Sequence, residues 1–119
     1  MPLKTYRDLD VWKVSMDLVD AIYDLTEKLP SHQRYTISSQ IERAALSIPL
    51  NIAEGYGRIH TGEYLHHLSY SQGSNREVET LLIIVARPKY VEKEELKTAW
   101  ELTQRVGMML TKLIKSLKK

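Results

Sequence analysis

The sequence predicts an all-α protein that folds as one up-down-up-down antiparallel four-helix bundle over residues 1–119. Four segments carry apolar residues at the spacing of three or four that is typical of helices, and none shows the alternation of a strand. Short connections that contain Pro30, Gly57 and Pro88 separate these segments, which favours antiparallel neighbours. With 119 residues, 43% of them hydrophobic, the chain can bury one core, and without cysteine it forms no disulfide.

The four helices are expected at about residues 9–28, 32–55, 61–86 and 92–117. Pro30 ends the first helix, because the residue before a proline disfavours the α conformation. Ser31 is a suitable cap for the second helix. Gly55 and Gly57 end that helix, one of them in the left-handed conformation that glycine adopts easily.

The third helix is expected to cross the second at close range. Thr61 suits its start as an N-cap, and Pro88 ends it. The run SQGSN at residues 71–75 is poor in helix-forming residues. Because small residues in mid-helix often mark a point where another backbone passes, we expect Gly73 and Ser74 at the crossing.

The first helix has an unusually wide apolar arc, made of two adjacent rows. Such a helix either lies at the centre of the bundle or offers its second face to another subunit. We take one row as the candidate oligomer interface: Val11, Val14, Leu18, Ile22 and Leu25. The acids between Asp10 and Glu27 form a separate stripe that suits solvent.

A polar row runs along the second helix from Gln40 to Arg58, at spacings of three or four. It is open to two interpretations, a nucleic-acid or ligand site and a hydrogen-bonded network that fixes the helix register. Acids and bases are available in equal number, with Glu54 pairing Arg58 and Glu77 pairing Arg43, which favours the structural network. Its expected members are Gln40, Arg43, Ser47, Asn51, Glu54, Ser74 and Glu77.

No catalytic, metal or cofactor motif stands out. The one E-x-x-H pair, Glu63 and His66, lacks the second copy that a carboxylate metal bundle needs. His66 and His67 are adjacent and point apart on a helix, and GYGR at residues 55–58 is a helix stop, not a phosphate loop. We therefore expect no enzyme activity, no metal and no cofactor. No signal peptide and no apolar stretch of about 18 residues is present, so a cytoplasmic protein outside the membrane is expected.

Charge is distributed unevenly although the net charge is only +2. Residues 10–27 hold five acids and one base, whereas residues 102–119 hold five bases and no acid. Such asymmetry points to a polyanion or an acidic partner. The candidate nucleic-acid-binding residues are Arg58, Arg105, Lys112, Lys115, Lys118 and Lys119. The alternative is that these bases compensate the helix dipole and form a solubilising tail.

Four segments carry a resemblance that covers nearly the whole chain: YRDLDVW at 6–12, IYDLTEKLP at 22–30, QIERAALSIPLNIAEGYGR at 40–58 and EYLHHLSYSQGSNREVETLL at 63–82. The chain resembles the ribosomal-protein-like four-helix-bundle proteins encoded in intervening sequences of 23S rRNA genes. It is similar also to the accessory variability protein of diversity-generating retroelements. The family pattern commonly has two adjacent arginines before the alanine pair. Here Glu42 replaces the first and only Arg43 remains, which would weaken a polyanion site there.

The resemblance implies a ring-like homopentamer, suspected nucleic-acid binding and no enzyme activity. In the retroelement relatives it implies a reverse transcriptase as partner. Our first hypothesis is therefore a non-enzymatic homo-oligomer that binds RNA or DNA through basic surface, as an adaptor to a reverse transcriptase or other nucleic-acid enzyme. The alternative is a structural or protein-interaction oligomer with no nucleic-acid role.

Overall fold

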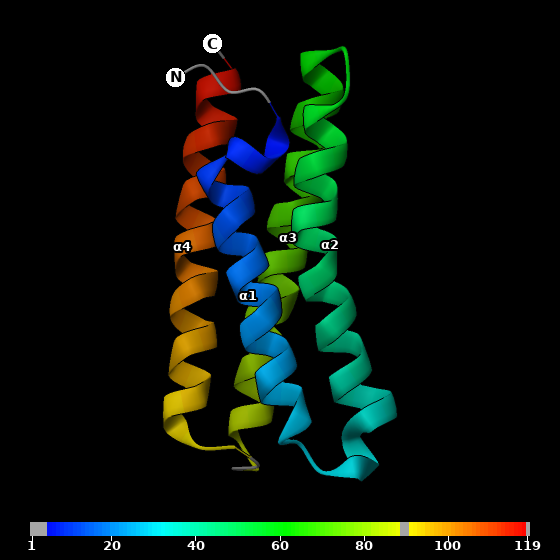
Figure 1. The fold of residues 1–119 in the computed structure, drawn as a ribbon, viewed down its shortest axis with the longest axis vertical. Helices are drawn as coiled ribbons and strands as arrows, with labels where there is room; N and C mark the ends of the chain where they lie inside the picture. The colour runs from blue at the N-terminus through cyan, green and yellow to red at the C-terminus, as the bar shows by residue number, and fades with distance from the viewer. Residues whose placement is uncertain (1–4, 89–90, 119) are drawn as a thin grey trace.

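The computed structural model describes residues 5–88 and 91–118, with only the backbone described at residues 33–35, and it is a four-helix bundle (Figure 1). The helices are α1 Asp10–Glu27, α2 Ser39–Tyr56, α3 Thr61–Ala86 and α4 Lys93–Leu117. The described residues contain no strand, and the Cα extents are 44 × 24 × 21 Å. The predicted all-α class and the four-helix architecture are confirmed.

The helices follow one another around the bundle, so that each packs against the next and α4 packs against α1. The amino end of α1, the carboxyl end of α4 and the α2–α3 connection lie at one end of the bundle (Figure 1). The α1–α2 and α3–α4 connections lie at the other end. Adjacent helices are therefore antiparallel, as the short connections predicted.

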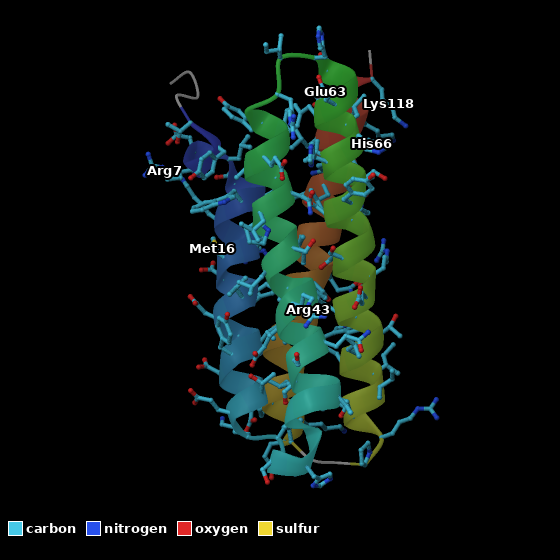
Figure 2. The ribbon with its side chains drawn as sticks, turned by 90° about the vertical axis from the view of Figure 1, so that its right-hand side faces the viewer. Arg7, Met16, Arg43, Glu63, His66 and Lys118 are labelled. Atoms are coloured by element: carbon cyan, nitrogen blue, oxygen red, sulfur yellow. The ribbon has the colours of Figure 1, made fainter. Side chains whose placement is uncertain are left out.

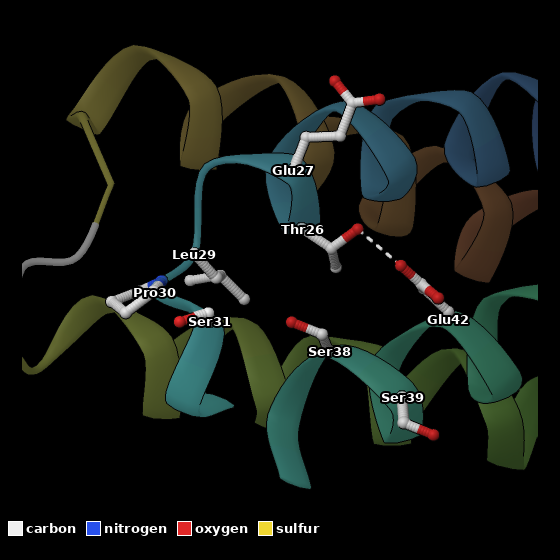
Figure 3. A pocket seen from close by; sticks show the side chains of 8 residues that line it. All are labelled: Thr26, Glu27, Leu29, Pro30, Ser31, Ser38, Ser39 and Glu42. Atoms are coloured by element: carbon white, nitrogen blue, oxygen red, sulfur yellow. Dashed lines mark hydrogen bonds between the residues drawn. The ribbon is translucent and has the colours of Figure 1, made fainter. Parts of the chain in front are cut away.

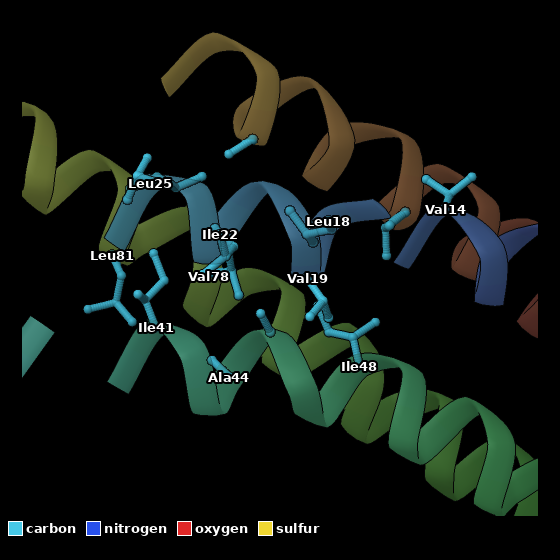
Figure 4. Close-up of a cluster of buried hydrophobic side chains, with 14 of the residues drawn as sticks. Val14, Leu18, Val19, Ile22, Leu25, Ile41, Ala44, Ile48, Val78 and Leu81 are labelled. Carbon is cyan, nitrogen blue, oxygen red and sulfur yellow. The ribbon is translucent and has the colours of Figure 1, made fainter. Parts of the chain in front are cut away.

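The core lies along the bundle axis, and the first helix contributes one whole row to it (Figure 4). Val11, Val14, Leu18, Ile22 and Leu25 are all 6% exposed or less. The prediction that this row forms an oligomer interface is wrong, because the bundle itself covers it. Both rows are apolar, and periodicity alone did not tell which of them faces the other three helices.

The second helix starts and ends differently from expectation. A 3₁₀ turn at Ser31–Gln33 and a π-helical turn at Arg34–Ser38 precede α2, so Ser31 does not cap a regular helix. At the other end Gly55 lies inside α2, and Gly57 has a right-handed φ of −79°. The left-handed glycine cap was therefore a wrong prediction. Thr61 is the first residue of α3, whose N-cap is His60.

The close crossing of α2 and α3 is made by Gly55, not Gly73. A Cβ at Gly55 would lie 2.7 Å from His67 Cβ and 3.0 Å from Tyr64 Cδ1, so only glycine fits there without a shift. Gly73 is exposed, and a Cβ there would meet nothing within 4 Å. The prediction holds for Ser74, whose hydroxyl contacts Ser47 on α2.

Candidate nucleic-acid interface

A ridge of basic side chains follows the outer side of α4 in its second half. The inner side of that helix buries Ala99, Thr103, Val106 and Leu110, which leaves the intervening positions to solvent. We call the exposed bases there the α4 basic ridge: Arg105, Lys112, Lys115 and Lys118. At about 1.5 Å per residue the ridge is roughly 20 Å long. Lys119, the last candidate, lies outside the described residues.

The ridge brings together four bases that have no acidic neighbours among the described residues. Among residues 5–88 and 91–118, no carboxylate lies within ion-pair distance of any of its four bases. Their positive charge is therefore not offset locally and acts on the surrounding solvent. The ridge ends at the pole of the bundle where both termini lie (Figure 1).

Three other surface bases, Arg58, Arg76 and Lys28, are paired with carboxylates. Arg58 lies 2.8 Å from Glu54 Oε1 and 3.7 Å from Glu63 Oε2. Arg76 contacts Glu79 at 2.7 Å, and Lys28 contacts Glu95 at 3.2 Å. Arg58 is at the same end of the bundle as Lys118, but its two carboxylates make it a poor phosphate ligand. The structure thus separates Arg58 from the ridge.

The polar row on α2 forms hydrogen bonds to α3. The Ser74 hydroxyl donates to Ser47 Oγ at 2.9 Å, and Asn51 Nδ2 donates to the Ser47 carbonyl at 3.0 Å. Asn51 Oδ1 lies 3.0 Å from His67 Nδ1. Farther along, Gln40 donates to Glu77 at 3.3 Å. These contacts fit the network interpretation of the row.

Arg43 departs from that network. Its side chain is exposed, and it has no ion-pair partner among the residues that the structure describes, so the expected pair with Glu77 is wrong (Figure 2). Glu77 accepts a hydrogen bond from Gln40 instead.

Two hydrogen bonds of the polar interior were not predicted from sequence. Ser71 is fully buried and donates to the Ile48 carbonyl at 2.9 Å, on the α3 side that also carries Ser74 and His67. Between α3 and α4, Asn75 donates to the Thr103 carbonyl at 2.9 Å. Ser71 and Asn75 are spaced by four, and this spacing within the polar run was the available signal.

The α3–α4 seam also explains a second glycine. A Cβ at Gly107 would lie 3.3 Å from Asn75 Nδ2, so α4 approaches α3 closely there. Nearby, Glu79 is 8% exposed and accepts from Arg76 at 2.7 Å and from Gln104 at 2.5 Å. This carboxylate is thus occupied by structural hydrogen bonds.

A cleft of about 680 Å³ opens beside the α1–α2 connection (Figure 3). Its lining is Thr26, Glu27, Leu29, Pro30, Ser31, Ser38, Ser39 and Glu42. Inside it, Thr26 Oγ1 donates to Glu42 Oε2 at 2.6 Å. Among the described side chains, two carboxylates and no base line the cleft, so we do not include it in the candidate interface.

Among the titratable groups of the described residues, Tyr64 has a shifted pKa. Burial raises the pKa of the Tyr64 hydroxyl, and the neighbouring Tyr56 adds to this effect. Within the described part of the chain, no three His, Asp or Glu side chains are grouped so as to hold a metal ion. No helix in that part has the length and apolar character needed to cross a bilayer.

Comparisons with known proteins give a family match and a similar solved structure. Residues 7–112 match the model of the 23S rRNA-intervening sequence protein family. The fold is similar to a crystal structure from Bacteroides thetaiotaomicron VPI-5482, described as a protein with unknown function from the S23 ribosomal protein family. The TM-score is 0.81 at 24% identity, over 88% of this chain and 95% of that chain. No curated protein sequence matches.

Proposed function

This chain belongs to the 23S rRNA-intervening sequence protein family, and we propose that it is a non-enzymatic bundle that binds RNA or DNA through the α4 basic ridge. The observation that carries the proposal is that no described carboxylate pairs with the four bases of the ridge, in contrast to Arg58, Arg76 and Lys28. A surface of unpaired bases attracts phosphate whatever the base sequence.

The size of the ridge suits a stretch of nucleic-acid backbone. One strand of B-DNA carries a phosphate about every 3.4 Å, so a ridge of roughly 20 Å faces about six phosphates. Four bases without carboxylate partners then bind mainly by displacing counterions from these phosphates. Contacts of this type position a protein on the backbone and carry no base specificity.

Self-association would strengthen such binding. The family resemblance leads us to propose a homo-oligomer, a pentamer by that resemblance, and copies of the ridge in one particle add their fields. In this proposal the assembly acts as an adaptor between nucleic acid and a nucleic-acid enzyme such as a reverse transcriptase. No substrate or cofactor chemistry is required of the bundle itself.

Salt titration of binding tests the proposal. The ridge variant replaces Arg105, Lys112, Lys115 and Lys118 by Gln, and a charge-matched control replaces Lys13, Lys28, Arg43 and Arg58 by Gln. Binding of fluorescent single-stranded RNA, duplex RNA and duplex DNA is measured at several salt concentrations. We expect the negative slope of log K against log salt to become less steep by about 3 for the ridge variant. Each lost phosphate contact removes about 0.7–0.9 from its magnitude.

The control set should keep most of the wild-type slope, because two of its four bases are already paired with carboxylates. Equal losses in the two variants would show that only net charge matters. No binding of the wild type to any of the three nucleic acids at low salt would reject the proposal. The protein-interaction oligomer would then be the better function, which exposed apolar side chains such as Leu50 and Met108 favour.

A further inference from the structure

The cleft beside the α1–α2 connection differs in charge from other hollows on the bundle (Figure 3). Its described lining contains two carboxylates, four hydroxyls and no base. Four other hollows in the described part of the chain each include a base: Lys28, Lys97, Arg58, or Arg76 together with Lys112. Because a concave surface focuses the field of the charges that line it, this cleft favours a cation.

The Ser38 hydroxyl is a buried polar group that points into the cleft (Figure 3). Ser38 is 7% exposed, and its side chain makes no capping hydrogen bond to α2. Among the residues that the structure describes, no other group forms a hydrogen bond with this hydroxyl. Since buried side-chain hydroxyls in proteins have hydrogen-bond partners in the large majority of cases, Ser38 points to a polar group that binds in the cleft.

Glu42 brings a half-buried carboxylate to the same space from α2. Its Oε2 accepts a hydrogen bond from Thr26 Oγ1 at 2.6 Å, and its Oε1 has no partner among the described residues. Because the Thr26 proton is donated to Glu42, the Thr26 oxygen is left as an acceptor. Together with Ser38 Oγ, the cleft thus offers three acceptor groups, the number that the three N–H donors of a primary ammonium require.

The helix ends beside the cleft are compatible with positive charge. The cleft lies at the carboxyl end of α1, where the helix dipole favours a cation. The dipole of α2 opposes a cation only near the first helical turn. A π-helical turn at Arg34–Ser38 precedes α2, so Ser38 and Glu42 lie beyond that first turn of helical backbone.

The size and the walls of the cleft suit a small organic cation better than a metal ion. Its volume of about 680 Å³ lies in the range of sites for small molecules. In the described part of the chain, no three His, Asp or Glu side chains are grouped for a metal ion. Leu29 and Pro30 provide an apolar wall, which matches methylene groups. Glu27 lies at the outer rim and points away from Ser38, so a second carboxylate is available at a distance from the first (Figure 3).

From these observations we propose that the cleft binds an aliphatic diamine or polyamine. One ammonium group donates hydrogen bonds to Glu42, Thr26 and Ser38. The methylene chain lies against Leu29 and Pro30, and the second ammonium group faces the carboxylate at the rim. The site is at the end of the bundle opposite the termini, whereas the α4 basic ridge ends at the termini, so this proposal does not depend on nucleic-acid binding (Figure 1).

Calorimetric titration of the full chain with putrescine at low salt tests the proposal. The site variants are Glu42→Gln and Ser38→Ala, and the matched control is Glu101→Gln, which removes an exposed carboxylate from α4. We expect Glu42→Gln to weaken binding about tenfold or more, because a hydrogen bond to a charged group is lost. Ser38→Ala should weaken it about 2- to 10-fold, as for a neutral hydrogen bond. The control should bind as the wild type does, and circular dichroism checks that each variant is folded.

Binding of three probes to the wild type identifies the ligand chemistry. Putrescine should bind more tightly than butylamine, which has one ammonium group, and more tightly than magnesium chloride. Equal affinities for putrescine and butylamine would overturn the role of the second ammonium group, and tighter binding of magnesium would overturn the organic cation. No binding of putrescine at millimolar concentration, or equal weakening in the site and control variants, would also overturn the proposal.

Nuclear magnetic resonance of the wild type locates the site without any substitution. Addition of putrescine should shift the amide signals of Leu29, Ser38 and Ser39, which line the cleft. Signals along the α4 basic ridge should stay in place. Shifts that exclude the cleft residues would overturn the proposal even if a site variant failed to fold.

Discussion

The first helix and the α2–α3 seam stabilise the same core by different chemistry. α1 contributes a row of five aliphatic side chains, and its one buried hydroxyl, Ser15, bonds within its own helix at 2.7 Å. α2 and α3 approach closely at Gly55 and carry hydrogen bonds between helices at Ser47–Ser74 and Ser71–Ile48. The contacts of α1 with the core are apolar, whereas the α2–α3 seam combines close packing with hydrogen bonds.

The difference separates stability from register. Apolar burial is proportional to area and has little directionality, so α1 can contribute much free energy without specifying one vertical position. Hydrogen bonds between buried groups have a fixed geometry, and a slip of one residue leaves them unpaired. We therefore expect substitutions in α1 to change mainly the free energy of unfolding. Substitutions in the α2–α3 seam should act through the close packing of the two helices and through their hydrogen bonds.

Truncation in the α1 row should give the largest effect. Leu18 is 0% exposed, and Leu18→Ala should lower the free energy of unfolding by about 2–5 kcal/mol, from lost burial and the cavity left behind. Urea unfolding followed by circular dichroism measures it. Ile59→Ala is the control, because Ile59 is 92% exposed and its loss should cost less than about 0.5 kcal/mol. A cost below about 1 kcal/mol for Leu18→Ala would mean that α1 is not central.

Two glycine-to-alanine substitutions should change the free energy of unfolding in opposite directions. Gly55→Ala places a Cβ 2.7 Å from His67 Cβ, and this overpacking should destabilise by about 1–3 kcal/mol. Gly73→Ala meets nothing within 4 Å and should stabilise by about 0.5–1 kcal/mol, because alanine is the better helix former. The two changes are chemically identical, so thermal unfolding of both gives an internal comparison. A stabilised Gly55→Ala variant would contradict the close approach of α2 to α3.

Sequence patterns predicted the elements well and the choice between similar positions poorly. Pro30 and Pro88 mark helix ends because proline restricts the residue before it, which is a local rule. Whether Gly55 or Gly73 lies at the crossing depends on the neighbouring helix, and a glycine has no side chain whose polarity would reveal it. The same holds for α1. Both of its rows are apolar, so polarity does not tell whether the row of Val11 or the row of Trp12 faces the core.

The candidate site shows the same division. Exposure of Arg105, Lys112, Lys115 and Lys118 followed from their spacing against the buried row of α4. The neutralisation of Arg58 required Glu54, which is visible at a spacing of four, and Glu63, which is brought near only by the α2–α3 turn. Glu77 pairs with Gln40 and not with Arg43, which lies three residues away on α2, and helical spacing alone does not distinguish the two.

The smallest predicted effect measures register directly. In a double-mutant cycle of Ser47→Ala and Ser74→Ala, we expect a coupling energy of about 0.5–1.5 kcal/mol, because their 2.9 Å hydrogen bond is partly buried. The matched cycle of Gln40→Ala and Glu77→Ala should give less than about 0.5 kcal/mol, because that 3.3 Å contact is exposed to competing water. Both cycles use urea unfolding. Equal couplings would show that the buried pair adds no more than a surface contact, and the α2–α3 register would then rest on the fit around Gly55.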